Sequence, residues 1–215
     1  MRIIDLATWQ HAERYRFFRG YTTPHYAITA DLDVTHLVSE LKPKGVSVFN
    51  ACAFALTHGA NAVPELRTRF RGDVVVEHDR IGTSFTVPLG EERFAFCQVD
   101  FVPDWPVFNA ACSAAVERAR SGETFSDTTG DDDQWIYMTC LPWLSFSAMT
   151  HPVKGPDDCV PRVGWGRYSD NGRGGITVPV ATQVHHALVD GLHLSKFYAA
   201  AQDTLDGLSA QVMNS

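Results

Sequence analysis

The segment from residue 175 to residue 189 constrains the fold most, because it is the longest apolar strand pattern in the chain. A helical pattern follows it directly, with Leu194, Phe197, Ala201 and Leu205 recurring at spacings of three and four. A long apolar strand must pair within a sheet, and the apolar side of the helix must pack on that sheet. We therefore expect a sheet covered by helices.

The rest of the chain alternates between helical and strand patterns. Helices are predicted from Thr8 to Arg19, from Asp33 to Leu41, over residues 48–63 and from Asp104 to Gly122. Strand patterns occupy residues 25–34, 65–70, 73–78, 81–89, 93–101, 134–141 and 144–150. This mixed order predicts an α/β (α+β) protein with a mixed β-sheet.

Composition limits the class of protein. The chain has 215 residues, of which 45% are hydrophobic and 20% charged, so we expect residues 1–215 to form a single domain. No apolar run reaches the ~18 residues of a membrane span, which predicts no membrane contact. Charges are scattered through the first residues where a signal peptide would be apolar, so a cytoplasmic location is expected.

Charge and cysteine spacing exclude further classes. A net charge of -7 disfavours nucleic acid as a partner, since phosphate binding needs a basic surface. A small-molecule substrate is therefore the better prediction. The five cysteines form no C-x-x-C pair, so we expect buried free thiols and no zinc site. The acidic segment 123–134 lacks the spacing of a calcium loop and is predicted to be a solvated loop, so no metal is expected.

One motif carries chemistry. P-loop, dinucleotide and G-x-S-x-G signatures are absent, whereas His185, His186, Asp190 and Gly191 form an H-H-x-x-x-D-G pattern between strand and helix. A neutral histidine can take a proton from a hydroxyl or thiol near pH 7. Two alternatives are a buried histidine beside an exposed one with Asp190 as a helix cap, and a metal site. Adjacent strand residues point to opposite faces, which disfavours the metal.

The motif QVHHALVDGLH resembles the active-site signature of the trimeric, type A chloramphenicol acetyltransferases and, more remotely, that of dihydrolipoamide acyltransferase catalytic domains. Four other segments match the same family in order: residues 9–37, the segment NAVPELRTRF, the FTV strand at 85–87 and LPWLSFSAM. The resemblance implies the CoA-dependent acyltransferase fold, a two-layer sandwich. It also implies acetyl-CoA as a cosubstrate and no permanently bound cofactor.

By this resemblance, His186 is the general base. It would deprotonate the hydroxyl of chloramphenicol, which then attacks the acetyl-CoA thioester directly in a ternary complex, so that the antibiotic is inactivated. Asp190 would pair with Arg19 in the first helix and fix the loop that presents His186. The family also implies a homotrimer whose active sites lie at subunit interfaces.

The resemblance carries further residues. Those implied in acceptor binding are Tyr26, Phe125, Phe146, Ala148 and Gly164, and those implied in CoA binding are Arg167 and Tyr168. Two positions depart from the family pattern: Ala148 stands where a serine usually steadies the oxyanion, and Gly164 where a threonine usually helps to hold a water. Ser145 and Ser147 are near, but strand alternation would turn them to the other face.

Three alternatives stay open at this point. The first is an enzyme of the same fold that acetylates a different hydroxyl acceptor, which the two departures favour. The second is a dihydrolipoamide acyltransferase core, although this sequence contains no lipoyl or subunit-binding domain. The third is a non-catalytic binding protein that kept the trimer and the pocket, against which the intact motif argues.

Overall fold

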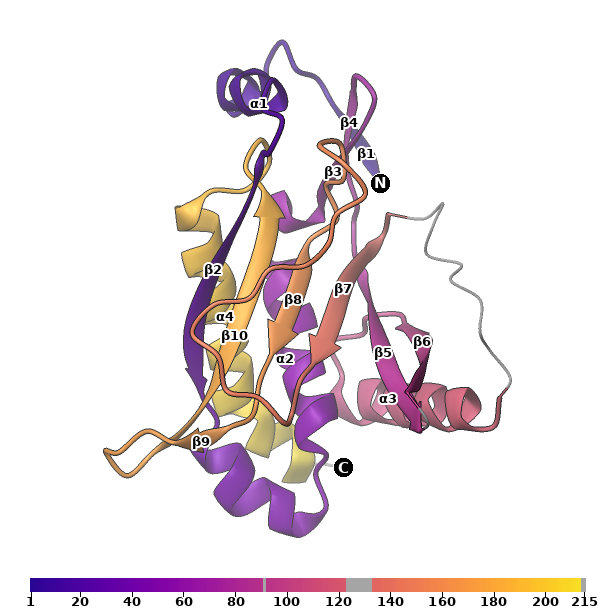
Figure 1. Ribbon diagram of the computed structural model, residues 1–215, viewed down its shortest axis with the longest axis vertical. Coiled ribbons are helices and arrows are strands. Elements are labelled where there is room, and N and C mark those ends of the chain that lie inside the picture. The colour runs from indigo at the N-terminus through magenta and orange to yellow at the C-terminus, as the bar shows by residue number, and fades with distance from the viewer. Residues whose placement is uncertain (91, 123–132, 214–215) are drawn as a thin grey trace.

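The computed structural model describes residues 1–90, 92–122 and 133–213. Its main sheet has seven strands in the order β2-β10-β8-β7-β5-β6, with β9 paired to β10 (Figure 1). The strands are β2 (His25–Asp33), β5 (Gly82–Gly90), β6 (Arg93–Val99), β7 (Trp135–Cys140), β8 (Arg162–Trp165), β9 (Ser169–Asp170) and β10 (Ile176–His185). The pairs β5–β7 and β7–β8 are parallel and the others antiparallel, so the predicted mixed sheet is confirmed.

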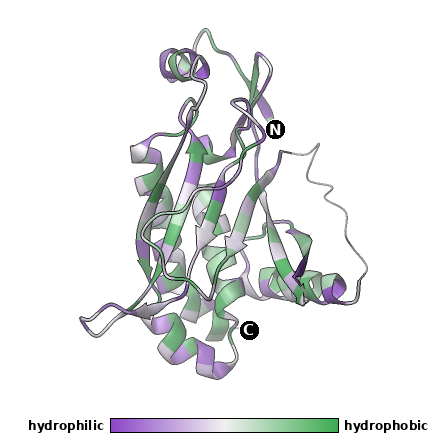
Figure 2. Cartoon of the chain, viewed as in Figure 1, coloured by the Kyte–Doolittle hydropathy of each residue, from purple (hydrophilic) through white to green (hydrophobic). Residues whose placement is uncertain are grey.

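Helices cover one face of this sheet. Helices α2 (Val48–Ala62), α3 (Trp105–Arg120) and α4 (Gly191–Met213) lie behind the sheet in Figure 1, which gives the two layers. Figure 2 shows apolar residues along β10 and on α2, where the layers meet. Helix α2 is buried on most of its surface, as its composition predicts, and Ser47 caps it by accepting a hydrogen bond from the Asn50 N–H at 3.2 Å.

A small second sheet lies at one end of the main sheet (Figure 1). Strands β1 (Arg2–Ile4), β3 (Thr68–Arg71) and β4 (Val74–Glu77) make a three-stranded sheet in the order β1-β4-β3. Helix α1 (Ala12–Arg19) lies beside it, at the end of the main sheet where β2 begins and β10 ends (Figure 1). Three short helical turns complete the fold: η1 (Leu37–Leu41), η2 (Lys42–Lys44) and η3 (Pro64–Arg67).

Some sequence predictions of elements are wrong. Helix α1 begins at Ala12 because Asp5 folds residues 5–8 into a turn, accepting a hydrogen bond from the Ala7 N–H at 2.9 Å. Residues 144–150 form no strand, although their pattern is strand-like. This segment belongs to a long connection, residues 141–161, that crosses the face of the sheet opposite the helices (Figure 1). There the carbonyl of Leu144 accepts one hydrogen bond, from the Arg167 N–H at 2.6 Å, and no ladder forms.

Two further predictions concern cysteines and acidic residues. The cysteines are free thiols, and all except the partly exposed Cys140 are buried. Most of the acidic segment 123–134 lies outside the described residues. Its described residue Asp133 is not solvated as predicted, because it pairs with Arg71 at 2.7 Å and His78 at 2.8 Å. Of the helices that the structure describes, none is long and apolar enough to cross a membrane.

Candidate active site

The two adjacent histidines of the motif have different environments. His185 is the last residue of β10 and is only 2% exposed. Its Nε2–H donates to the carbonyl of Pro156 at 2.8 Å, and its Nδ1 accepts from the Ala187 N–H at 3.1 Å. Burial lowers the pKa of His185 to about 4, so it stays neutral. Both ring nitrogens are already bonded, which makes His185 a structural residue.

His186 begins the loop between β10 and α4 and is partly exposed. Its backbone N–H donates to the carbonyl of Pro24 at 2.9 Å. Its Nδ1 lies 3.2 Å from the carbonyl oxygen of Val189. Because a carbonyl only accepts, Nδ1 must carry the proton, which leaves a free lone pair on Nε2. The structure therefore prepares Nε2 of His186 to take a proton.

Two aromatic rings hold the imidazole of His186. The Phe18 ring stacks on it with a centroid distance of 3.9 Å and an interplanar angle of 14°. The Tyr26 ring lies 4.6 Å away, so the structure brings this predicted residue beside the histidine. Burial and the neighbouring Asp190 raise the pKa of Tyr26 to about 12, and its phenol stays neutral. The rings restrict the rotation of His186 without adding charge.

Asp190 starts α4 and ties the loop to α1. Its Oδ1 accepts hydrogen bonds from the N–H groups of Leu192 at 3.0 Å and His193 at 3.2 Å, which caps the helix. Its Oδ2 pairs with Nη1 of Arg14, whose Nη2 donates to the carbonyl of Leu188 at 2.9 Å. A single guanidinium therefore holds the loop that presents His186 at two points, Leu188 and Asp190.

The predicted pair of Asp190 with Arg19 is wrong. Arg19 pairs with Asp157 instead, and its guanidinium lies over the Phe70 ring at 4.1 Å. Helical phase explains the difference, because Arg14 and Phe18 are four residues apart and share one face of α1. Arg19 is five residues from Arg14, about 140° around the helix, and faces away from the loop.

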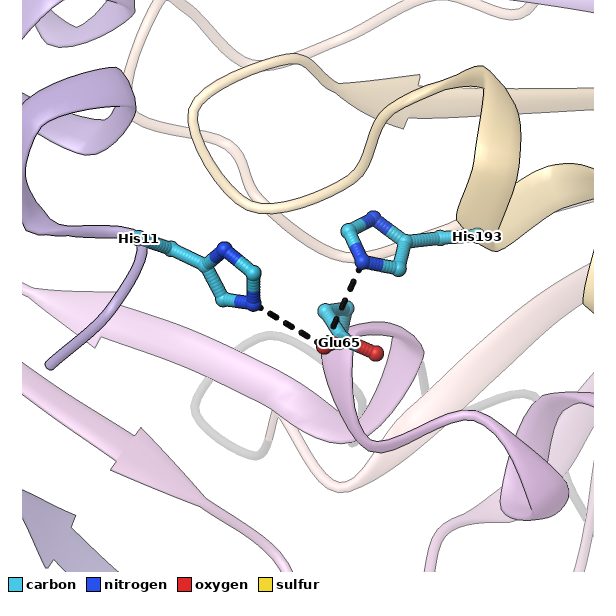
Figure 3. Close-up of side chains that lie close together, drawn as sticks. All are labelled: His11, Glu65 and His193. Atoms are coloured by element: carbon cyan, nitrogen blue, oxygen red, sulfur yellow. Dashed lines mark hydrogen bonds and ion pairs between the residues drawn. The ribbon is translucent and has the colours of Figure 1, made fainter.

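A second set of contacts, among His11, Glu65 and His193, supports the start of α4 (Figure 3). One oxygen of Glu65, Oε1, lies 3.3 Å from Nε2 of His11 and 3.3 Å from Nε2 of His193. The hydrogen bond from His193 lowers the pKa of Glu65 to about 2, in spite of its burial. Glu65 therefore stays ionised and accepts from both rings.

The same three side chains have the composition of a metal site, and their ligand atoms lie within 4.8 Å of one another. The existing contacts of His193 argue against a metal. Its Nδ1 lies 3.1 Å from the backbone nitrogen and 3.0 Å from Oδ1 of Asp190, and its Nε2 lies 3.3 Å from Oε1 of Glu65. Both ring nitrogens are therefore already paired within the protein. The cluster is a hydrogen-bonded support for the loop that carries His186.

The residues predicted to bind CoA line a cavity of about 490 Å³ on the helix side of the sheet. Arg167 and Tyr168 form its rim, and Val48, Phe49 and Cys52 of α2 are on its wall. Lys42 was not predicted from sequence, yet its Nζ donates to the Tyr168 hydroxyl at 2.8 Å and lies 5.4 Å from the ring centroid. The cavity thus combines an apolar wall with Arg167 and Tyr168, and Lys42 contacts Tyr168 beside it.

The predicted acceptor residues do not gather in one place within a single chain. Phe146 lines a shallow polar hollow with Ser145 and Ser147. Ala148 is exposed and lies in no strand, so the alternation argument about its serine neighbours does not apply. Phe125 lies outside the described residues. A methyl group at Gly164 would lie 1.9 Å from Cε of Met149, so Met149 occupies the space that a larger residue would take.

A second cavity, of about 420 Å³, opens on the face of the sheet opposite the helices. We call it the sheet-face cavity. It is lined by Ser84, Phe85, Thr86, Phe96, Tyr137, Met138, Thr139, His151, Pro152, Val153, Lys154 and Arg162. Thr139 lines this cavity while its neighbour Cys140 lines the one by α2, because successive side chains of β7 point to opposite faces. Among the described residues that line either cavity, His186 does not occur.

Comparisons with known proteins identify the family of the chain. The family model described as "Chloramphenicol acetyltransferase" matches residues 1–202. The chain belongs to the chloramphenicol acetyltransferase family. "Chloramphenicol acetyltransferase 2" of Escherichia coli is 26% identical over 95% of this chain and 97% of its own length. The Streptomyces acrimycini chloramphenicol acetyltransferase is 28% identical over 94% of this chain and 93% of its own length.

Solved structures place the chain in the same fold. A chloramphenicol acetyltransferase superposes with a TM-score of 0.85 at 25% identity and covers 95% of this chain and 99% of its own. The dihydrolipoamide acetyltransferase of Azotobacter vinelandii superposes with a TM-score of 0.66 at 17% identity, over 94% of this chain and 88% of its own. The second likeness concerns the fold alone. Membership of the chloramphenicol acetyltransferase family confirms the resemblance read from the motifs.

The sequence alone did not indicate that Arg14, Phe18, Lys42 and the sheet-face cavity belong to the candidate site. A helical signal for the first two was present, since residues 14 and 18 share a face of α1. No local signal pointed to Lys42 or the cavity. Both depend on contacts between segments that are distant in sequence, such as Lys42 with Tyr168.

Proposed function

We propose that the protein transfers an acetyl group from acetyl-CoA to a hydroxyl of chloramphenicol and thereby inactivates the antibiotic. The observation that carries the proposal is the free Nε2 of His186, which results from the bond between Nδ1 and the Val189 carbonyl. The chain's family and the order of its motifs support the same substrate pair.

The reaction proceeds in one complex without an acyl-enzyme. Nε2 of His186 takes the proton of the acceptor hydroxyl as its oxygen attacks the thioester carbonyl. A carbon–oxygen bond forms, and the tetrahedral intermediate then collapses with cleavage of the carbon–sulfur bond. The proton passes from His186 to the departing sulfur, which leaves as the CoA thiol. The neutral imidazole is restored for the next turnover.

The cavity beside α2 is the proposed binding site for acetyl-CoA. Arg167 and Lys42 supply cations for its phosphates, and the Tyr168 ring supplies a surface for adenine. The chain has a net charge of -7, and CoA is itself highly anionic. The two cations would give the local positive region that binding of CoA requires. Acetyl-CoA acts as a cosubstrate, and we place the enzyme in the cytoplasm where that metabolite is available.

The sheet-face cavity is the proposed acceptor pocket, completed by His186 of a second subunit in a homotrimer. Two features support a shared site. The first is that His186 lies on the loop after β10, whereas the cavity spans β5 to β8 and excludes it. The second is the exposed apolar pair Trp143 and Leu144, at 67% and 55% exposure on the segment that crosses this face. Such side chains are typical of a subunit interface.

The test is acetyl transfer by the purified protein, followed as release of CoA thiol in the presence and absence of chloramphenicol. We expect chloramphenicol-dependent release, and a loss of about 10²–10⁴-fold in kcat for His186→Ala. The matched control is His185→Gln, which alters the adjacent structural histidine and should leave turnover per folded molecule within a few-fold. Full activity in His186→Ala would refute the mechanism.

A different hydroxyl acceptor is the second candidate, and the Ala148 and Gly164 positions favour it. Ala148 offers no hydroxyl, and the space beside Gly164 is filled by Met149. A panel of hydroxyl compounds in the same assay separates the candidates. Release of CoA with another acceptor but not with chloramphenicol would select the second. An absence of release with every acceptor, with acetyl-CoA binding retained, would indicate a non-catalytic binding protein.

A further inference from the structure

His151 is an unusual residue of the sheet-face cavity, because both of its ring nitrogens are buried and have no hydrogen-bond partner among the described residues. A neutral imidazole always carries one N–H donor and one acceptor nitrogen. Leaving a buried donor or acceptor unpaired costs about 1–3 kcal/mol. The described part of the folded chain therefore leaves the hydrogen-bonding capacity of the His151 ring unused.

The backbone of His151 is nevertheless fixed. Its N–H donates to Oε1 of Gln183 at 2.5 Å, and its carbonyl accepts from Nε2 of the same side chain at 3.2 Å. Gln183 belongs to β10 and is itself buried. The two bonds join the crossing segment to the sheet at this residue. The backbone that carries the ring is thus fixed by the sheet before any molecule enters the cavity.

Gly164 leaves room for Met149 and, beside it, for the ring of His151. A methyl group at Gly164 would lie 3.3 Å from Cε1 of His151, which is closer than most methyl contacts in proteins. Gly164, which departs from the family pattern, therefore has the ring of His151 packed close to it. A larger residue at position 164 would crowd both Met149 and the imidazole of His151 at the wall of the cavity.

Burial and a nearby cation keep the ring of His151 neutral. Burial, followed by the nearby Arg162, lowers the pKa of His151 to about 4. The guanidinium of Arg162 is itself paired with Asp158, at 3.1 Å and 2.5 Å, and lies 5.3 Å from the Tyr137 ring centroid. Lys154 also lines the cavity. A neutral ring in this setting offers one donor and one acceptor to a bound molecule.

We propose that His151 is a specificity-determining residue that forms a hydrogen bond with a neutral polar group of the acceptor, at a distance from the hydroxyl that is acetylated. The inference rests on the proposed function, because it takes the sheet-face cavity as the acceptor pocket. The acceptor class it selects has an apolar body, to pack on Phe96 and Pro152, and a neutral hydrogen-bonding group such as an amide. Chloramphenicol belongs to this class.

The experiment compares wild type with His151→Leu and His151→Gln. For chloramphenicol we expect KM to rise about tenfold in His151→Leu with kcat within threefold, since a hydrogen bond to bound acceptor is lost. His151→Gln retains a donor and an acceptor and should recover part of the affinity. In the absence of acceptor, the thermal midpoint of His151→Leu should equal or exceed that of wild type, because no bond is broken and an unpaired group is removed.

The control is His58→Leu. His58 lies on α2, and its Nδ1 bonds to the Thr204 hydroxyl at 3.1 Å, so this change should leave KM unaltered and should not raise the midpoint. An unchanged KM in His151→Leu with an active wild type would overturn the inference and leave the proposed function intact. A lower midpoint in His151→Leu would also overturn it. A wild type that does not acetylate chloramphenicol would refute the proposed function, and the unfolding comparison would still decide whether His151 lacks a partner.

Discussion

Arg14 and Arg19 contact different carboxylates although both belong to α1. Arg14 joins Asp190 and the Leu188 carbonyl, and so holds the loop of His186. Arg19 pairs with Asp157, whose side chain is 74% exposed. The sequence motif indicated His186 and Asp190 because both lie in one short run. It could not identify the arginine, since that choice depends on the helical phase and on the packing of α1 against a loop far along the chain.

The first prediction compares these two arginines. Arg14→Ala should lower the free energy of unfolding by about 2–3 kcal/mol, because Oδ2 of Asp190 loses its paired cation in a partly buried place. It should also lower kcat/KM at least tenfold. Arg19→Ala should lower the free energy of unfolding by about 1 kcal/mol or less, because its partner Asp157 is well solvated. Urea unfolding and the CoA-release assay measure both effects, and equal losses of activity in the two variants would contradict the assignment.

At the scale of elements, α2 and α4 pack closely where Gly59 faces α4. A methyl group at Gly59 would lie 2.8 Å from the carbonyl oxygen of Phe197. Gly207, on α4, has no atom within 4 Å of the corresponding position. The apolar pattern predicted α2, α4 and their buried faces correctly. The strand predicted at 144–150 was wrong because a strand-like pattern does not reveal whether a neighbouring strand has a free edge to pair with.

The second prediction uses this pair of helical glycines. Gly59→Ala should destabilise the protein by about 1–3 kcal/mol, because the two backbones cannot separate without loss of packing. Gly207→Ala should stabilise it by about 0.5–1 kcal/mol, because alanine favours the helix and the site is open. Thermal unfolding of the two variants beside wild type tests the contrast. A stabilising Gly59→Ala would show that the helices have room to move apart.

The third prediction concerns the connection 141–161, which is held by the neutral His185 through the Pro156 carbonyl. The pKa of His185 is lowered from 6.5 to about 4 by burial, so the unfolded chain binds the proton first as pH falls. Stability is therefore complete above pH 6.5 and decreases toward pH 4. Between pH 7 and pH 5 this residue should account for up to about 2 kcal/mol.

The measurement is urea unfolding of wild type and His185→Gln at both pH values. The variant lacks the titrating ring, so its loss of stability between pH 7 and pH 5 should be smaller by that amount. An identical pH dependence in the two proteins would mean that His185 is not held neutral in the fold.

At the scale of the whole molecule, the single chain separates the proposed base from the proposed acceptor pocket. The composition and length of the chain predicted one compact domain, and only the resemblance suggested that a site is divided between subunits. No local pattern can reveal this, because the contacts that complete the proposed site would join two copies. The cavity and His186 must be tested as parts of different chains.

The fourth prediction is complementation between two inactive variants. His186→Ala lacks the base, and Thr86→Trp fills the sheet-face cavity. In mixed trimers formed from equal amounts, about a quarter of the shared sites join an intact cavity to an intact His186. Co-refolded mixtures should therefore recover about a quarter of the wild-type activity. Mixtures as inactive as the separate variants would place the whole site within one chain.

The position of β2 at the edge of the sheet has a consequence for synthesis. Its only neighbour in the described sheet is β10, with which it pairs from His25 opposite His185 to Asp33 opposite Thr177. On the ribosome β2 is made early and β10 late, so β2 must wait unpaired while the intervening chain emerges. During that interval its exposed edge is open to other nascent chains. Production of this protein should depend on chaperones that shield β2 until translation is nearly complete.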